Sequence, residues 1–253
     1  MNVGRVALLS VALLALAACA KTNDPGYQGW VEADLIFVSP DEVGRVETLS
    51  VREGDTVEKG APLFTVDPDL QQADVEMAKA SVTNATQAYE RAQTLLKTSA
   101  GTQKTVEDAE AALRTAQARL ASAQTRLARR KAASPVTGSV QQIYYRPGEL
   151  VPAGRPVVSL LPPGNINIRF FVPETVLPSV ALGEAVTIHC DGCKTDVTAK
   201  VTFISRTSEF TPPVIYSLDE RSKLVFLIEA RTGTPGELRV GQPVDVRFAE
   251  NRK

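Results

Sequence analysis

The sequence predicts a mainly β protein in which a small β-unit is split by one long antiparallel α-helical hairpin and is followed by a small antiparallel β-barrel. Three observations support this fold class: a glycine-punctuated repeat in two separated copies, a heptad pattern between the copies, and short alternating segments downstream. Each copy is too small to bury a core alone, so we expect the two copies to fold onto each other as one β-unit. The segment between them, residues 68–133, is then an insertion carried by that unit.

The repeat starts at Gly44 and again at Gly138, and its two copies align without a gap. Glycines at fixed offsets mark turns that need a positive φ or a close backbone approach, and the alternating apolar residues between them indicate short strands. The β-unit therefore takes residues 40–67 and 134–162, and a strand over residues 30–39 is expected to enter its first half. The matching positions are Gly44/Gly138, Val46/Val140, Arg52/Arg146, Gly54/Gly148, Val57/Val151, Gly60/Gly154 and Pro62/Pro156.

The insertion has the spacing of two packed helices. Apolar or small residues recur at intervals of three and four from Val75 to Leu96, and again from Val106 to Leu127. This heptad spacing is typical of a coiled coil. Two helices of about 30 residues joined by a short loop form an antiparallel hairpin that projects roughly 45 Å.

Local signals set the ends of both helices. Asp67 caps the first helix and Pro68 suits its first position. Gly101 is expected at the C′ position after this helix, and Thr102 or Thr105 caps the second one. Arginines and a lysine gather over residues 126–131, where the helix dipole favours cations.

The region after residue 163 consists of β-branched or alternating runs separated by Pro, Gly and Asp clusters. Such a pattern is typical of a small antiparallel barrel or sandwich. The expected strands are residues 166–172, 185–189, 197–204, 224–230 and 244–248.

The N-terminus has the organisation of a secretory signal. Arg5 is followed by an apolar stretch too short to span a bilayer and then by the small residues that precede Cys19. Residues 16–19 resemble the bacterial lipobox, so we expect residues 1–18 to be a lipoprotein signal peptide and Cys19 to be acylated. The alternative is an ordinary secretory signal with an incidental cysteine.

Cys190 and Cys193 form an even pair beside His189, the only histidine of the chain. They follow one expected strand and precede another, so they lie at a turn rather than at the helix start of a redox motif. A structural disulfide or two free thiols are the favoured states. A zinc site requires four ligands, and this cluster offers at most three.

Composition and motifs argue against several function classes. The net charge is −1 and the pI is about 6.0, so there is no basic field for a nucleic acid. The sequence contains no phosphate-binding loop, no dinucleotide fingerprint and no nucleophile elbow, and a single histidine disfavours a Ser/His/Asp triad. We therefore expect neither enzymatic activity nor a cofactor.

A split repeat around a heptad hairpin, followed by a β-region, resembles the membrane fusion proteins, the HlyD-type periplasmic adaptors of export systems. The half-repeats resemble the halves of a lipoyl/biotinyl-type domain, although no biotin-type Met-Lys-Met motif is present. Residues 205–214 and 220–226 resemble the barrel region of lipoprotein adaptors that serve ABC-type exporters. The resemblance implies residues 19–39 as a lipidated tether and first strand, a lipoyl-like domain of two halves, the hairpin, and a barrel domain over residues 163–253.

Arg91, Leu95 and Thr102 match the Arg-x₃-Leu-x₆-Ser motif with which adaptors of this family dock an outer-membrane channel of the TolC type, with threonine in place of serine. The resemblance thus implies an adaptor that links an inner-membrane transporter, of the ABC permease and ATPase type, to that channel. It further implies a homo-oligomeric ring and a lipid-anchored periplasmic location. The inner membrane is favoured, although Ala20 lacks the aspartate of the usual retention signal. The alternative function is a lipid-anchored binding or interaction module not tied to a transporter.

Overall fold

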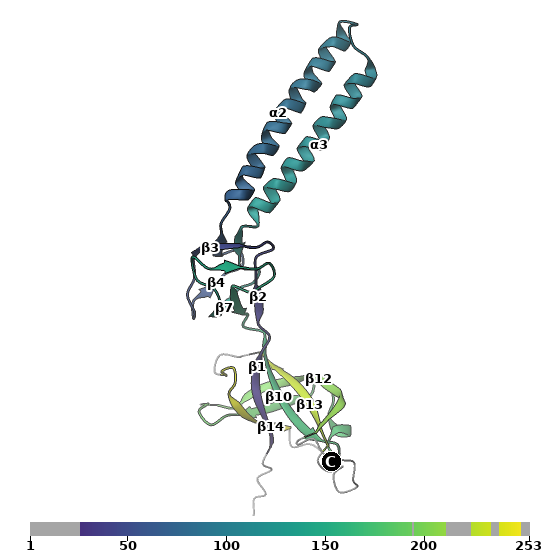
Figure 1. Ribbon diagram of the computed structural model, residues 1–253. Helices are drawn as coiled ribbons and strands as arrows, with labels where there is room; N and C mark the ends of the chain where they lie inside the picture. The colour runs from purple at the N-terminus through teal and green to yellow at the C-terminus, as the bar shows by residue number, and fades with distance from the viewer. Residues whose placement is uncertain (1–25, 194, 211–223, 234–237, 249–253) are drawn as a thin grey trace, which may run out of the picture. The chain divides into compact units, whose positions relative to one another are not determined.

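The computed structural model describes residues 26–193, 195–210, 224–233 and 238–248 (Figure 1). The chain divides into two compact units, Ala33–Asn165 and Met1–Glu32 with Ile166–Lys253. The first unit holds a small β-domain and the helical hairpin, and the second unit holds a β-barrel. The expected fold class, mainly β with a long helical hairpin and a small antiparallel barrel, is confirmed.

The β-domain consists of two four-stranded sheets, each of which combines strands from both halves of the repeat. One sheet has the order β2-β9-β7-β4 and the other the order β6-β5-β3-β8. The first half supplies β2 (Ile36–Val38), β3 (Gly44–Leu49), β4 (Thr56–Val57) and β5 (Pro62–Val66). The second half, which begins where the hairpin returns, supplies β6 (Lys131–Ala133), β7 (Gly138–Ile143), β8 (Leu150–Val151) and β9 (Val158–Leu161).

Equivalent positions of the repeat make equivalent contacts. Gly54 and Gly148 adopt φ values of 91° and 94°, a region that favours glycine. The backbone N–H of Gly54 donates to the Val140 carbonyl at 2.9 Å, and the N–H of Gly148 donates to the Val46 carbonyl at 2.8 Å. Each turn therefore closes onto the opposite half, so neither half could be completed without the other.

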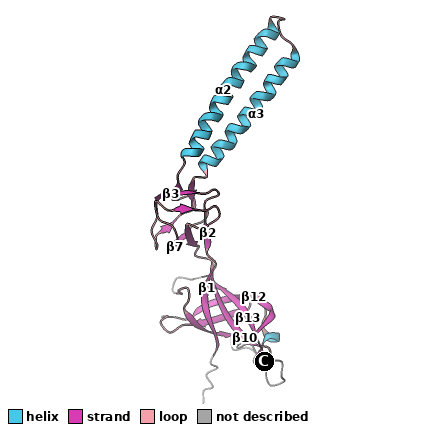
Figure 2. Ribbon diagram, in the orientation of Figure 1, coloured by secondary structure: helices cyan, strands magenta, loops and turns pink. Residues whose placement is uncertain are grey.

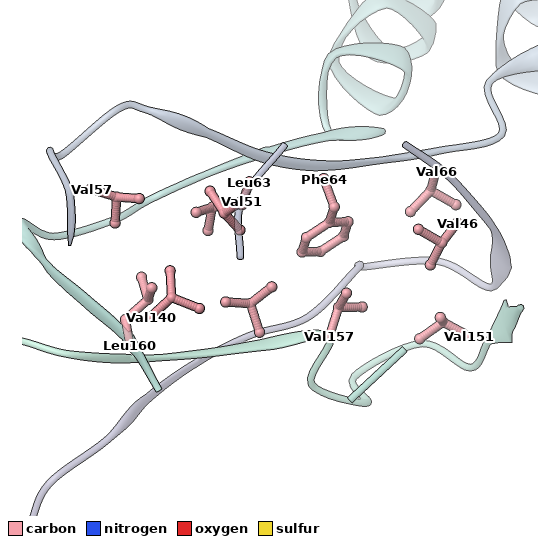
Figure 3. Close-up of a cluster of buried hydrophobic side chains, with 11 residues drawn as sticks. Val46, Val51, Val57, Leu63, Phe64, Val66, Val140, Val151, Val157 and Leu160 are labelled. Carbon is pink, nitrogen blue, oxygen red and sulfur yellow. The ribbon is translucent and has the colours of Figure 1, made fainter. Parts of the chain in front are cut away.

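The core of this domain lies between the two sheets (Figure 3). Phe64 lies in its centre and is 1% exposed, and Val46 and its repeat equivalent Val140 are equally buried. The other members are Val51, Val57, Leu63, Val66, Val151, Val157, Val158 and Leu160. Burial of side chains from both halves stabilises the interlocked pair, because the area removed from water grows with each strand that joins.

The hairpin consists of α2 (Asp69–Lys97) and α3 (Gln103–Ala128), which pack along the heptad seam (Figure 2). Every seam position expected from the sequence is buried or half-buried, with Val75, Ala92, Val106, Ala116 and Ala123 the most enclosed. Among the helices in the described parts of the chain, none combines the length and apolar character needed to cross a membrane.

The second unit is a closed barrel of six antiparallel strands in the order β1-β10-β13-β12-β11-β14. Four of the expected strands are close to their observed bounds, and the run expected at residues 197–204 continues to Phe210. The strands are β1 (Tyr27–Ala33), β10 (Ile166–Pro173), β11 (Ala185–His189), β12 (Val197–Phe210), β13 (Leu224–Thr232) and β14 (Pro243–Phe248).

The expectation of one strand over residues 30–39 is wrong. The structure has two strands there, and β1 belongs to the barrel, where it pairs with β14 from Tyr27↔Val246 to Trp30↔Pro243. Val31 is fully buried in the barrel, whereas β2 pairs with β9 of the β-domain. The residues between the strands thus change domains, and a continuous strand would leave Val31 without its core.

Candidate docking site at the hairpin tip

The tip of the hairpin is closed by a helix C-cap that places Ser99, not Gly101, in the left-handed conformation. Ser99 has φ 59°, its N–H donates to the Leu96 carbonyl at 3.0 Å, and the Ala100 N–H donates to the Leu95 carbonyl at 2.9 Å. These two bonds form a Schellman motif with Ser99 at C′. The prediction of Gly101 at C′ is therefore wrong by two positions.

Gly101 instead allows a close approach to Leu95. A Cβ atom added at Gly101 would lie 3.1 Å from the Leu95 Cβ and 3.2 Å from the Leu95 carbonyl carbon. These separations are shorter than ordinary van der Waals contact, so a larger residue would push against the last turn of α2. The loop thereby fixes the backbone of Leu95, whose side chain remains 47% exposed.

Thr102 caps the second helix. Its Oγ1 accepts a hydrogen bond from the Thr105 N–H at 3.2 Å and lies 2.8 Å from the Thr105 Oγ1. This bond satisfies one of the free N–H groups at the start of α3. The Thr102 side chain is also exposed to solvent, so its hydroxyl caps α3 and remains accessible to another molecule.

Arg91 lies one helical turn before Leu95 on the exposed side of α2. Its guanidinium makes no hydrogen bond or ion pair with any described residue, whereas Arg114 is paired with Glu110 and Arg126 with Asp74. Of the other arginines of the hairpin, only Arg119 likewise makes no ion pair or side-chain hydrogen bond with a described residue. The donors of Arg91 are thus available to another molecule.

The structure brings two of the three expected residues into one surface hollow. Arg91 and Leu95 line it together with Gln87, Glu90 and Thr94. Thr102 does not line this hollow and lies across the turn at the start of α3. The hollow offers an apolar contact beside a guanidinium that forms no ion pair with any described residue.

The root of the hairpin contains a polar network that the sequence did not reveal. Arg130 is buried, and its guanidinium donates to the Glu42 carboxylate at 3.2 Å and to the Val43 carbonyl at 3.1 Å. Gln71 donates to the same Glu42 oxygen at 2.9 Å. We expected the cations of residues 126–131 to serve the helix dipole, but this one ties α3 to the loop before Gly44.

Cys190 and Cys193 are joined by a disulfide in the turn between β11 and β12. The Nδ1 atom of His189 lies 2.8 Å from the Asp196 carboxylate, across the same turn. No cluster of three or more potential metal ligands occurs in the described part of the chain. Cys19 and the expected signal peptide lie outside the described residues, as do residues 211–214 and 220–223 of the two segments that resemble exporter adaptors.

Comparison with known proteins identifies the split β-domain and its hairpin. Residues 36–161 match the family model of the barrel-sandwich hybrid domain of RND membrane fusion proteins, and this range begins with β2 and ends with β9. The chain belongs to the membrane fusion protein family. Two interlocked half-repeats with a hairpin inserted between them form the hybrid domain of this membrane fusion protein.

Relatives and solved structures share parts of this arrangement. A UPF0194 membrane protein of Acidithiobacillus ferridurans, located in the asrC 5′ region, is 33% identical over 117 residues, which is 46% of this chain and 35% of that protein. The membrane fusion protein Spr0693 of Streptococcus pneumoniae R6 has a TM-score of 0.70 at 19% identity, covering 89% of this chain and 98% of that one. A MacA–MexA chimera with the Pseudomonas aeruginosa MexA α-hairpin has a TM-score of 0.71 at 21% identity, covering 88% and 78%. The matched region spans less than half the length of curated relatives such as the first of these.

Proposed function

We propose that this membrane fusion protein is the periplasmic adaptor of a tripartite export system, linking an inner-membrane transporter of the ABC type to an outer-membrane channel. The observation that carries the proposal is the exposed pair at the hairpin tip. Arg91 has no partner among the described residues, and Leu95 is a half-exposed apolar side chain in the same hollow. An unpaired cation beside an apolar anchor is the composition of a small protein-binding site.

The mechanism assigned to this adaptor is mechanical. The tip contacts the channel, the hairpins of several copies line a conduit, and the energy for export comes from the transporter. The two outer faces of the hairpin differ, since α2 carries exposed Leu70 and Met77 while α3 carries the exposed ion pair of Lys104 and Asp108. Contact between two unlike faces is head-to-tail, and such contacts close into rings when the rotation permits.

The proposed anchor is an acylated Cys19, which holds the body of the protein in the periplasm at the inner membrane. Attachment through several acyl chains is durable, because each buried CH₂ contributes about 0.8 kcal/mol. In this proposal the barrel meets the transporter, the hybrid domains of several copies pack in a ring, and the tip meets the channel.

The decisive experiment is site-specific photo-crosslinking from the tip in intact cells. A photoreactive residue at Lys97 is expected to capture the outer-membrane channel in the chain with an intact tip. Arg91→Asp combined with Leu95→Ser is expected to abolish both the crosslink and export. One charge reversal at a small contact weakens binding by a few kcal/mol, which is enough to prevent the tip from binding the channel.

Arg119→Asp is the matched control, because Arg119 is also exposed and unpaired but lies in the middle of α3. This variant is expected to retain the tip crosslink. Retained export in the Arg91→Asp, Leu95→Ser variant, with hairpin helicity unchanged, would contradict docking through the tip. That outcome would favour the alternative of a lipid-anchored binding module.

A further inference from the structure

A second surface hollow lies on the outer face of the barrel. It has a volume of about 550 Å³ and is lined by residues of β1, β10, β11 and β14 and of the turn after β11. The strand register explains how its residues meet, since Asp245 lies opposite Gln28 on one side and opposite His189 on the other. The hollow belongs entirely to one unit of the chain and is separate from the hairpin tip.

One wall of this hollow is aromatic. The rings of Trp30 and Phe171 have their centroids 5.7 Å apart with planes inclined at 49°, and Trp30 is 38% exposed. Gly29 makes this arrangement possible, because a Cβ there would lie 2.3 Å from the Arg169 carbonyl oxygen. The absent side chain lets β1 approach β10 closely and brings the two rings together.

The opposite wall is acidic. Asp191 and Asp245 line it and make no ion pair with any described residue, and Asp196 is bonded to His189 at 2.8 Å. Neither lining carboxylate therefore forms an ion pair with a cation of the described chain.

The nearest arginine of β10 is already engaged. Arg169 contacts Glu32 at 2.7 Å and Glu229 at 2.9 Å. The hydrogen bond that Arg169 donates to the Glu229 carboxylate raises the pKa of Arg169 above its ordinary value, while burial opposes the shift. Arg169 is thus held by its own carboxylates and does not neutralise the hollow.

The aromatic rings and the carboxylates of the hollow together favour a cationic ligand. Aromatic faces attract cations that shed their water easily, and carboxylates supply charge attraction from the other side. An open, partly apolar hollow with a few converging polar groups is the usual form of a small-molecule site. An organic cation can contact both the rings and the carboxylates that line this hollow.

We propose that the barrel of this protein binds a small organic cation with an alkylated ammonium group, which lies between the Trp30–Phe171 wall and the carboxylates of Asp191 and Asp245. The proposal is independent of the adaptor function, because it concerns the barrel and not the tip. It adds a ligand site to a part of the chain for which the adaptor function requires only contact with the transporter.

The single tryptophan of the chain provides the assay. Trp30 is the only tryptophan, so its fluorescence reports directly on the hollow. The full chain, purified in a maltoside detergent that lacks a choline headgroup, is titrated with choline and with 3,3-dimethyl-1-butanol, its neutral isostere. Sodium chloride at equal ionic strength gives the baseline.

Choline is expected to change the fluorescence along a saturable curve, with the neutral isostere binding about tenfold more weakly. Asp191→Asn with Asp245→Asn is expected to weaken choline binding about tenfold, whereas Glu174→Gln, an exposed acid of the same unit outside the hollow, leaves it unchanged. Circular dichroism verifies that each variant is folded. Calorimetric titration of the unmodified chain with both probes gives a second measurement that needs no variant.

Equal responses to choline and its neutral isostere would overturn the proposal, as would a response that does not saturate. Unchanged choline affinity in the folded double-Asn variant would also overturn it, because the acidic wall would then have no role.

Discussion

Replacing Arg130 by methionine tests whether the buried network at the hairpin root stabilises this unit. The Arg130 side chain is 8% exposed and bonds the Glu42 carboxylate and the Val43 carbonyl. Methionine preserves most of the apolar length but leaves Glu42 with Gln71 as its remaining donor. Removing one partner of a buried pair costs about 3–5 kcal/mol. The Glu42 side chain is 41% exposed and can recover some hydration, so we expect a loss of about 2–3 kcal/mol in the free energy of unfolding of this unit.

Two spectroscopic probes separate the units in a urea titration. Both long helices belong to the unit Ala33–Asn165, so ellipticity at the helical minimum follows that unit. The fluorescence of Trp30 follows the barrel. Arg130→Met is expected to move the helical transition to lower urea and leave the tryptophan transition unchanged.

A double-mutant cycle with Glu42→Gln isolates the pair, and a coupling energy of about 1–2 kcal/mol is expected. An unmoved helical transition in Arg130→Met would refute the assigned role of the network. Equal shifts of both transitions would refute the assumption that the two units unfold separately.

The remaining predictions concern the tip, the disulfide and the anchor. Ser99→Gly should stabilise the hairpin unit by about 1 kcal/mol in the same urea assay, because glycine adopts the C′ conformation without strain; a destabilised variant would contradict the assigned motif. Thr102→Ala should cost about 1 kcal/mol through the lost cap, whereas Thr102→Asp should retain the cap and weaken the channel crosslink; a crosslink unaffected by Asp would remove Thr102 from the docking site. Replacing Cys190 and Cys193 together by serine should lower barrel stability by no more than about 2 kcal/mol, since the closed loop is short, and should leave export intact; lost export with normal folding would reveal a functional role. Cys19→Ser should release the protein from membranes into the soluble fraction. Mass spectrometry of the mature N-terminal peptide tests the same claim; an unmodified peptide that does not begin at Cys19 would exclude the anchor.

The sequence was most informative where a pattern repeats. The paired glycines fixed the turns of the hybrid domain, because Gly54 and Gly148 need the same rare backbone conformation in two places. The heptad seam was equally predictable from the sequence, since Val75 and Ala92 must face α3 whatever lies outside the hairpin. Such features depend on local spacing alone, and local spacing can be seen in a single sequence.

Features that join distant segments were not predictable in this way. The pairing of β1 with β14 connects the two ends of the described chain, and no local pattern in Tyr27–Ala33 distinguishes it from a strand that enters the hybrid domain. The partnership of Arg130 with Glu42 likewise crosses the whole hairpin insertion. Glycine is the commonest residue at C′, so the sequence favours Gly101 there, but α2 ends at Lys97 and Ser99 takes the left-handed conformation.

The three residues of the tip motif do not support docking equally. Thr102 caps α3, and any hairpin whose second helix starts there benefits from a hydroxyl at that position, whether or not the tip binds a partner. Leu95 and Arg91 have no such structural contact: the leucine side chain is half-exposed, and the guanidinium is unpaired within the described chain. No described hydrogen bond or ion pair engages the Arg91 side chain, and close to half of Leu95 is exposed to solvent. These two residues therefore carry the argument for docking, and a loss of docking seen only in Thr102→Ala would be explained equally well by a frayed helix.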